Sequence, residues 1–318
     1  MKRTVLGIDT SCYTTSVACF GAAGPLYDGR TLLPVRQGSR GLRQSEGVFL
    51  HTRQLPPLVE AAFAEVDPQS IGAVCCSAAP VEGEDSYMPV FLTGLGGARA
   101  VASALSVPIR TTNHQCGHIR AALIGNESKL SEDSFYCVHL SGGTTDLLLV
   151  ERKGPGRFRI QPLGKSTDLH AGQMVDRVGV ALGCAFPSGK ELEALARQAA
   201  DTSIRIPASV QGLSCSLSGA ESAAQRLIEQ GADRAGIAFG VYDLLSRTLT
   251  KWLTNAQAQL GSRPVLLCGG VASSLLLRKL LQDRSDLPLI FGESRFSSDN
   301  AVGVAALGFD AMEDRAWN

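Results

Sequence analysis

Three features that mark membrane, secreted or strongly basic proteins are missing from this sequence. No apolar run approaches the length of a membrane span, and Met1-Lys2-Arg3 leads directly into a strand-like stretch, without the apolar segment of a signal peptide. The 30 Lys and Arg residues balance the 30 Asp and Glu residues, so the chain has no long-range field that would attract nucleic acid or an anionic membrane. We therefore expect a cytoplasmic protein without membrane contact, in which any RNA contact is local or comes from a partner subunit.

Several metal and nucleotide motifs are absent as well. The nine cysteines are an odd number without a C-x-x-C pair, which argues against a disulfide framework or a cysteine zinc site and favours reduced, mostly buried thiols. The H-E-x-x-H motif does not occur, which disfavours a metalloprotease. The complete glycine fingerprint of dinucleotide-binding domains is also missing.

The length and the pattern of elements favour two domains. A chain of 318 residues can form two cores of ordinary size, and predicted strands alternate with predicted helices, which indicates an α/β protein. The polar run at 126–133, NESKLSED, has no periodicity and is the best boundary. We predict an N-terminal subdomain at 1–130 and a C-terminal subdomain at 131–318 with a helical insertion, whose last helix packs back toward the first subdomain.

A glycine-rich hairpin in the middle of the chain has the chemistry of a phosphate site. The apolar run 135–140 stops at Ser141-Gly142-Gly143-Thr144-Thr145-Asp146 and resumes at 147–150, which predicts strand, tight turn, strand. Glycines let the backbone approach a ligand closely, and the hydroxyl groups add hydrogen-bond donors. Taken alone, Gly-Gly between two strands is more typical of an ordinary hairpin turn, and the repetition of the pattern favours the phosphate site.

The start of the chain repeats this pattern. A strand-like run at 4–9, a small polar turn at 10–15 and a second strand at 16–20 follow one another, and an acidic residue again stands at the edge of the turn, Asp9 here and Asp146 in the second copy. Two such hairpins about half a chain apart suggest a duplicated architecture with a nucleotide between its halves. Asp9 and Ser11 are therefore candidate phosphate contacts.

A strand-to-helix junction gives a further nucleotide signal. Gly269 and Gly270 lie between the predicted strand 265–268 and the predicted helix 275–281. Glycines at this place let a phosphate or a flat ring lie against the backbone near the positive end of the helix. Close packing of the helix on the sheet is the alternative explanation, but the two hairpins favour adenosine.

Two histidines and a distant aspartate are candidate metal ligands. His114 and His118 are four residues apart, so on a helix both imidazoles project from one face. Asp299 opens a predicted C-terminal helix and is the candidate third ligand for zinc, iron or manganese. Local hydrogen bonding is the alternative role of the histidines, and helix capping is that of Asp299, although Ser298 could supply the cap instead.

Seven segments, in this order, resemble the TsaD/OSGEP family of tRNA threonylcarbamoyladenosine synthases, once called O-sialoglycoprotein endopeptidases. The resemblance covers nearly the whole chain. The segments are LGIDTSCYTTSVA, NHQCGHIRAAL, LSGGTTDLLLV, AGQMVDRVGVALG, CSLSGAESA, CGGVASSLLLR and SSDNAVGVAALG.

The resemblance implies an actin/Hsp70-like (ASKHA) fold of two subdomains that hold an adenine nucleotide and a metal. It implies transfer of threonylcarbamoyl from its adenylate to the adenosine beside the anticodon of tRNA, with iron or zinc and ATP or an acyl or carbamoyl adenylate as cofactors. A TsaB-like partner or a homodimer is implied too. By the same resemblance His114, His118 and Asp299 are the metal ligands, and 141–146 is the phosphate loop. The sugar and base contacts are Asp176, Gly189, Gly269, Gly270 and Ser274.

The chain also departs from the family pattern. Asp9-Thr10-Ser11-Cys12-Tyr13 stands where the family has Glu-Thr-Ser-Cys-Asp, so Tyr13 replaces an acidic residue and the catalytic residue is unknown. Thr144 replaces His or Asn, Asp146 replaces Gln, and Ser274 replaces Asn. The alternatives are therefore a divergent paralogue that acts as a carbamoyltransferase or ATPase on another acceptor, a sugar kinase of the same fold, and a non-catalytic partner subunit.

Overall fold

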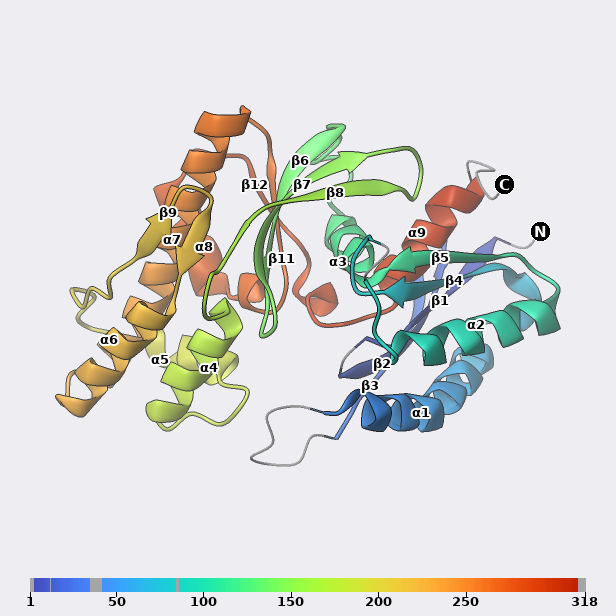
Figure 1. Cartoon of the computed structure of the whole chain (residues 1–318), viewed down its shortest axis with the longest axis horizontal. Helices are drawn as coiled ribbons and strands as arrows, with labels where there is room; N and C mark the ends of the chain where they lie inside the picture. Colours follow the sequence, from blue (N-terminus) through green and yellow to red (C-terminus); the bar gives the residue numbers. More distant parts are fainter. Residues whose placement is uncertain (1–2, 12, 35–41, 84–85, 314–318) are drawn as a thin grey trace. The chain divides into compact units, whose positions relative to one another are not determined.

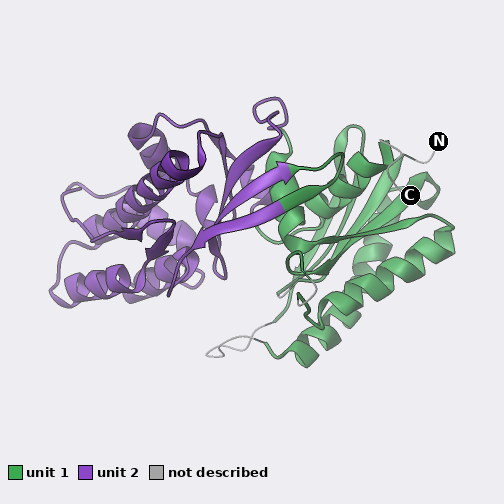
Figure 2. Ribbon diagram, turned by 45° about the horizontal axis from the view of Figure 1, so that its top comes forward, with its two compact units in different colours: residues 1–125, 152–159, 298–318 green, residues 126–151, 160–297 purple. Residues whose placement is uncertain are grey.

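The computed structural model describes residues 3–11, 13–34, 42–83 and 86–313, and it divides into two compact units. Unit 1 comprises Met1–Gly125, Arg152–Arg159 and Ser298–Asn318, and unit 2 comprises Asn126–Glu151 and Ile160–Ser297 (Figure 2). Each unit has its own five-stranded sheet and its own helices, so the predicted α/β class is confirmed.

The sheet of unit 1 has the strand order β3-β2-β1-β4-β5 (Figure 1). β1 pairs antiparallel with β2 and parallel with β4, β2 pairs antiparallel with β3, and β4 pairs parallel with β5. β1 and β2 are the two predicted strands of the first hairpin. The strands are β1 (Thr4–Asp9), β2 (Thr14–Gly21), β3 (Gly24–Leu32), β4 (Ile71–Ala79) and β5 (Ile109–Asn113).

Helices cover both faces of this sheet. Leu6 and Ile8 of β1 join a core cluster with residues of α1 and α2, whereas Val5, on the opposite face, packs with Val304 of α9. Successive side chains of a strand point to opposite faces, so a strand that is apolar throughout must be covered twice. The helical elements are α1 (Gln44–Glu65), η1 (Pro68–Ser70), α2 (Phe91–Leu105), α3 (His114–Leu123) and α9 (Val302–Glu313).

The helix α1 begins at Gln44, about three turns before the start that the sequence predicts. The prediction has Pro56 and Pro57 in the first turn of a helix, whereas the structure places both inside α1. His51 and Leu55, on the N-terminal side of the prolines, are buried. Burial of this upstream part therefore outweighs the local cost of proline, which a rule based on single residues does not capture.

The C-terminal helix α9 belongs to unit 1, which differs from the predicted division at 130/131. It contacts β1, β2, β4 and α3. The approach is close, because a Cβ atom added at Gly303 would lie 1.9 Å from the carbonyl oxygen of Gly117 in α3. Segment Arg152–Arg159 also joins this unit, since a Cβ atom at Gly156 would lie 2.2 Å from the carbonyl oxygen of Leu307.

The sheet of unit 2 has the order β12-β11-β6-β7-β8. β11 pairs parallel with both β12 and β6, and β6 pairs antiparallel with β7. The predicted second hairpin is therefore β6 and β7. The strands are β6 (Ser134–Leu140), β7 (Thr145–Arg152), β8 (Phe158–Lys165), β11 (Val265–Cys268) and β12 (Leu289–Phe291).

The long helix α7 runs through the core of unit 2. Fifteen of its 27 residues are buried, and they include Trp252 and Tyr242. A small two-stranded sheet, β9 (Ser209–Gln211) with β10 (Ser214–Ser216), replaces the short strand predicted at 213–219. The helical elements are α4 (Ala171–Ala181), α5 (Gly189–Ala196), α6 (Ser218–Glu229), α7 (Arg234–Leu260), η2 (Val271–Ser273), α8 (Leu275–Arg284) and η3 (Ser294–Phe296).

A helix that crosses a bilayer needs about 20 predominantly apolar residues. Among the described residues, no helix combines the length and the hydropathy that a membrane span needs.

Substitution of Gly303 tests the close contact between α9 and α3. Gly303→Ala would place a methyl group onto the backbone of α3, so we expect the free energy of unfolding to fall by about 1–3 kcal/mol. The matched control is Gly96→Ala, because Gly96 lies in α2 and a methyl group there would have no atom within 4 Å. Alanine favours helix there, so the control should be neutral or slightly stabilising. Urea denaturation measures both, and equal effects would contradict the contact.

His51 lies in the core between α1 and β2. Its side chain is fully buried, and its Nδ1 lies 2.8 Å from the hydroxyl of Thr15, which also donates to Oε1 of Gln54 at 2.7 Å. Its Nε2 has no hydrogen-bond partner among the described residues. Burial lowers the pKa of His51 to about 4, although the negative charge of Asp9 opposes this shift. The folded chain therefore holds His51 neutral.

Acid should weaken the fold through His51. Between its usual pKa of 6.5 and about 4 the unfolded chain binds a proton that the folded chain does not, so stability is full above 6.5 and falls as the pH drops to about 4. The expected loss is roughly 3 kcal/mol over this range. His51→Gln removes the titrating group, so its unfolding free energy should depend less on pH. Chemical denaturation over the range from neutral pH down to about 4 measures the difference, and parallel profiles would refute it.

Candidate metal centre and nucleotide site

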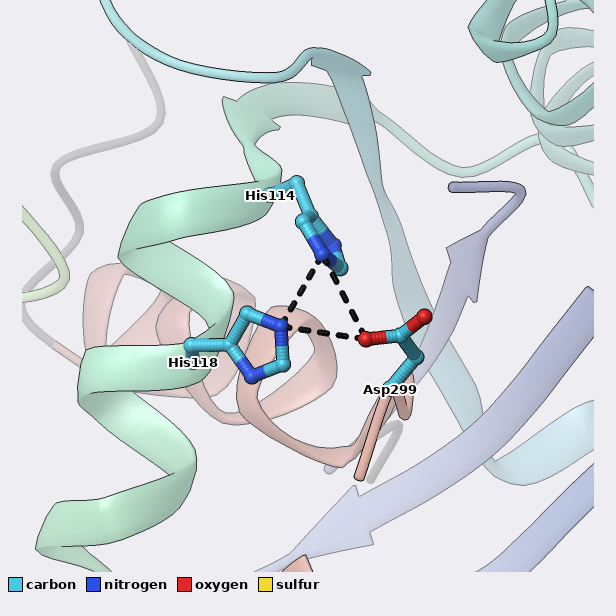
Figure 3. A group of neighbouring side chains, drawn as sticks. All are labelled: His114, His118 and Asp299. Carbon is cyan, nitrogen blue, oxygen red and sulfur yellow. Dashed lines mark hydrogen bonds and ion pairs between the residues drawn. The ribbon is translucent and has the colours of Figure 1, made fainter. Parts of the chain in front are cut away.

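The two histidines and Asp299 meet within unit 1 (Figure 3). His114 and His118 occupy the first two turns of α3, and their Nε2 atoms lie 2.9 Å apart. Oδ1 of Asp299 lies 3.3 Å from Nε2 of His118 and 3.7 Å from Nε2 of His114. Within the described part of the chain, these three side chains form the one group of histidine, cysteine and acidic residues whose arrangement could hold a metal ion.

Separate residues cap the two helices that carry this group. The side-chain oxygen of Asn113 accepts a hydrogen bond from the backbone N–H of Cys116 and so begins α3 just before His114. Asn300 does the same for α9, since its Oδ1 accepts from Val302 N at 3.0 Å and from Gly303 N at 3.4 Å. The cap that sequence reasoning offered to Asp299 or Ser298 thus belongs to Asn300, and Asp299 faces the histidines.

Asp9 holds His114 from the other side of its ring. The carboxylate of Asp9 is fully buried at the end of β1, and its Oδ1 lies 3.1 Å from Nδ1 of His114. The hydroxyl of Ser77 donates to its Oδ1, and Ser11 donates to Oδ2 through its hydroxyl at 2.7 Å and through its backbone N–H at 3.4 Å. A carboxylate on Nδ1 fixes the tautomer of a histidine and leaves Nε2 for a metal.

Asp9 and His114 each stabilise the charged form of the other. Burial alone would raise the pKa of Asp9, but the charge and hydrogen bond of His114 and the two serine hydroxyls outweigh it and lower that pKa. Burial would likewise lower the pKa of His114, yet Asp9 and then Asp299 raise it to about 9. The metal-free site is therefore an ion pair of a carboxylate and an imidazolium.

The first hairpin occupies a different place from the one expected of a phosphate loop. Asp9 and Ser11, predicted phosphate contacts, are both buried and lie around His114. Tyr13 is 43% exposed at the turn, and the hydroxyl of the next residue, Thr14, reaches Asp299 at 3.5 Å. Cys12, which is part of the same predicted turn, lies outside the described residues. The described residues of this turn therefore lie beside the candidate metal ligands.

Sequence reasoning missed Ser77, although the topology carried a signal for it. β4 runs parallel to β1, with Cys76 beside Ile8, so the next residues along the two strands, Ser77 and Asp9, lie side by side. Ser77 and Asp9 meet there through their hydrogen bond. A prediction of parallel pairing between these strands would have placed the serine at the site.

The second hairpin presents a glycine turn in unit 2. Ser141 N donates to the carbonyl oxygen of Thr144 at 2.8 Å and closes the turn, and both Gly142 and Gly143 are exposed, with no atom within 4 Å of the place where a Cβ would stand. The N-terminus of α4 packs beneath it, because Ala171 N donates to the hydroxyl of Thr145 at 2.8 Å. An open glycine turn beside a helix N-terminus is suited to an anion. Asp146, also predicted for this loop, has a pKa that burial raises.

The Gly269–Ser274 junction lies next to this turn. β11 and β6 are parallel neighbours, so the segments that follow them start at the same edge of the sheet. Gly269 has a positive φ of 94°, and a Cβ atom there would lie 2.3 Å from the carbonyl oxygen of Leu140. The close packing of Gly269 against Leu140 brings the Gly269–Gly270 turn beside the Gly142–Gly143 turn. Close packing and a nucleotide site are therefore compatible explanations for this glycine.

Asp176, Gly189 and Ser274 lie on the helices around these turns. Asp176 Oδ1 accepts a hydrogen bond from Ser188 N at 2.7 Å at the start of α5, and burial raises its pKa although this hydrogen bond opposes the shift. The carbonyl oxygen of Gly189 accepts from the Tyr242 hydroxyl at 3.0 Å. Ser274 caps α8 by accepting from Leu277 N at 3.2 Å, so the serine found in place of the usual asparagine has a structural role.

Known proteins resemble this chain over most of its length. Residues 48–306 match the family model of TsaD, described as tRNA N6-adenosine threonylcarbamoyltransferase. The protein of that name from Nitrosomonas europaea is 30% identical over 96% of this chain and 91% of its own length. The one from Thermus thermophilus is 31% identical over 95% of this chain and 90% of its own length.

Solved structures show the fold. The activator of 2-hydroxyisocaproyl-CoA dehydratase from Clostridium difficile has a TM-score of 0.56 at 12% identity, over 98% of this chain and 97% of that one. HypF from T. kodakarensis has a TM-score of 0.62 at 15% identity, over 98% of this chain and 48% of that one. These proteins share the actin/Hsp70-like fold, as predicted. With the family model matched over most of its length, the chain belongs to the TsaD family of tRNA N6-adenosine threonylcarbamoyltransferases.

Proposed function

We propose that this protein transfers a threonylcarbamoyl group from its adenylate to the adenosine beside the anticodon of tRNA. The observation that carries the proposal is the meeting of His114, His118 and Asp299 in a chain of this family. The imidazoles and the carboxylate come from distant parts of the sequence, so their meeting is a product of the fold.

We infer that this group holds a divalent iron or zinc ion. Imidazole nitrogens and a carboxylate oxygen are ligands that both ions accept, and the three ligand atoms lie within 4.8 Å of one another. Asp9 keeps Nε2 of His114 directed at the same space as His118. A bound ion would supply a Lewis acid that polarises the carbamoyl carbonyl or neutralises the adenylate phosphate.

Unit 2 offers the groups proposed for the nucleotide. The turn at Gly142 and Gly143 exposes backbone that can receive the phosphate at the N-terminus of α4. Gly172 packs against Gly142, since a Cβ atom at Gly172 would lie 2.7 Å from it, and Asp176 lies one turn later on α4. Oδ1 of Asp176 accepts from Ser188 N, so its Oδ2 can accept the ribose hydroxyls. The Gly269–Gly270 turn leaves room for the base.

The transfer itself exchanges one bond for another. The amine of the acceptor adenosine attacks the carbamoyl carbon, a carbon–nitrogen bond forms, and the bond from that carbon to the phosphate oxygen breaks. The amine loses its proton, and AMP leaves. Backbone N–H groups of the glycine turn would stabilise the charge that develops on the departing phosphate.

Metal content tests the ligand group directly. Asp299→Asn and His118→Ala each remove a ligand atom, so binding of Zn²⁺ or Fe²⁺ should be lost in titration calorimetry and elemental analysis. Asp9→Asn leaves the ligands in place and should weaken binding by roughly ten- to hundredfold, as outer-shell substitutions do. Asp67→Asn, an exposed cap of η1, is the matched control and should bind as the wild type does. Unchanged metal content in Asp299→Asn and His118→Ala would reject the site.

Reconstituted transfer tests the reaction. Full-length protein, loaded with metal and mixed with threonylcarbamoyl adenylate, ANN-decoding tRNA and a TsaB-like partner subunit, should form threonylcarbamoyladenosine, detected by mass spectrometry of the digested tRNA. The Asp299→Asn variant should lose at least roughly a hundredfold in rate, because it lacks the charge that stabilises the transition state. Asp67→Asn should retain the activity. Saturable ATP hydrolysis without any transfer would instead favour the ATPase alternative, and no nucleotide binding would favour a partner subunit.

A further inference from the structure

Three arginines surround one buried aspartate in unit 2, and none of these four residues is assigned a role above. Asp243 lies on α7 and is 1% exposed. Arg205 Nη1 donates to both of its carboxylate oxygens, at 2.9 and 2.8 Å, and Arg247 Nε donates to Oδ2 at 2.8 Å. Arg284, the last residue of α8, donates to Oδ1 through Nη2.

The charges in this arginine cluster do not balance. Asp243 is the one carboxylate within 4.0 Å of the three guanidinium groups in the described part of the chain. Burial would raise the pKa of Asp243, but hydrogen bonds from Arg247 and Arg205 and the positive charges lower it, so the carboxylate is ionised. At ion-pair distance three positive charges face one negative charge, a surplus of two among the groups in direct contact.

The surplus charge is accompanied by unused hydrogen-bond donors. A guanidinium has five N–H groups in a planar fork, and Arg205 uses Nη1 alone on Asp243. Its side chain is 63% exposed, which leaves Nε and Nη2 free to face solvent. Arg284 likewise uses only Nη2. Planar forks held in place by a buried carboxylate fit the oxygens of a phosphate group.

A pocket of about 300 Å³ lies on the same side of α7. Phe239, which lines it, precedes Asp243 by four residues and so projects from the same face of the helix. Lys279 of α8, five residues before Arg284, also lines the pocket and is exposed, so the pocket carries a positive charge of its own. A surface with cations around an aromatic ring suits a polynucleotide better than it suits an isolated phosphate.

We infer that the arginine cluster of Arg205, Arg247 and Arg284 binds the phosphodiester backbone of the tRNA substrate. The inference rests on the proposed function for the identity of that RNA. The whole chain carries 30 basic and 30 acidic residues, so affinity for a polyanion has to come from a local surplus such as this one. A backbone contact would position the tRNA without reading its sequence.

A purely structural role for the cluster predicts something different. One arginine is enough to balance Asp243, and Arg247 already ties the 201–208 segment to α7 because its Nη2 donates to the carbonyl oxygen of Ile206 at 2.6 Å. If the arginines only hold these segments together, their loss should change the melting temperature and leave RNA binding as it was. The two roles can therefore be separated by experiment.

The test is binding of fluorescent tRNA to the full chain at several salt concentrations. Arg205→Gln and Arg284→Gln each leave Asp243 two arginines, and each should lower the affinity roughly three- to tenfold near 0.1 M salt and reduce the slope of log K against log salt by about 1. Arg205→Lys keeps the charge without the planar fork, so it should bind more tightly than Arg205→Gln and keep the wild-type salt slope, with an affinity below the wild type. Arg226→Gln is the matched control, because Arg226 is an exposed arginine on α6 of the same unit.

The outcomes separate this inference from the proposed function. Wild-type affinity and salt slope in Arg205→Gln and Arg284→Gln, or an equal loss in Arg226→Gln, overturn the inference even if the wild type modifies tRNA. Weaker binding in both variants with a normal control supports it even if the wild type transfers nothing, in which case the proposed function fails alone. If Arg205→Gln melts at a lower temperature than the wild type, its tRNA affinity is compared with that of Arg205→Lys. Tighter binding by Arg205→Lys supports the inference, because it follows the positive charge, and equal binding by the two variants overturns it.

Discussion

The contact between the backbones of α3 and α9 is the constraint on which the candidate metal centre depends. Gly117 and Gly303 allow the two helices to approach so closely that no side chain fits between them. His114 and His118 stand on one helix, and Asp299 stands just before the other. A wider separation of the helices would move the carboxylate away from the imidazoles, so two residues without side chains determine where the chemically active ones lie.

The buried carboxylate of Asp9 raises the pKa of His114 and so controls the charge of the candidate metal centre. A carboxylate at the end of β1 would be costly to bury alone, and it is satisfied by two serine hydroxyls and by the ring of His114. The same bonds orient the imidazole. One buried carboxylate thus links the ends of β1 and β4 to the orientation of His114.

Sequence reasoning predicted the parts that local pattern controls. The two hairpins appeared as β1 with β2 and β6 with β7, and the histidine spacing placed both rings on one helix face. It failed where distant packing decides: α1 begins well before Pro56, Asn300 rather than Asp299 caps α9, and Ser77 reaches Asp9 only through the pairing of β1 with β4. The arginine cluster could not be predicted either, since Arg205, Arg247 and Arg284 are far apart in the chain.

The grouping of Ser298–Asn318 with the N-terminal half bears on how the protein is made. His114, His118 and Asp9 leave the ribosome long before Asp299, so a nascent chain carries two imidazoles that the carboxylate of Asp299 cannot yet join. An ion held by all three proposed ligands could bind only after translation has passed residue 299. Metal binding would then be a late step of maturation, possible only after α9 has packed on the sheet of unit 1.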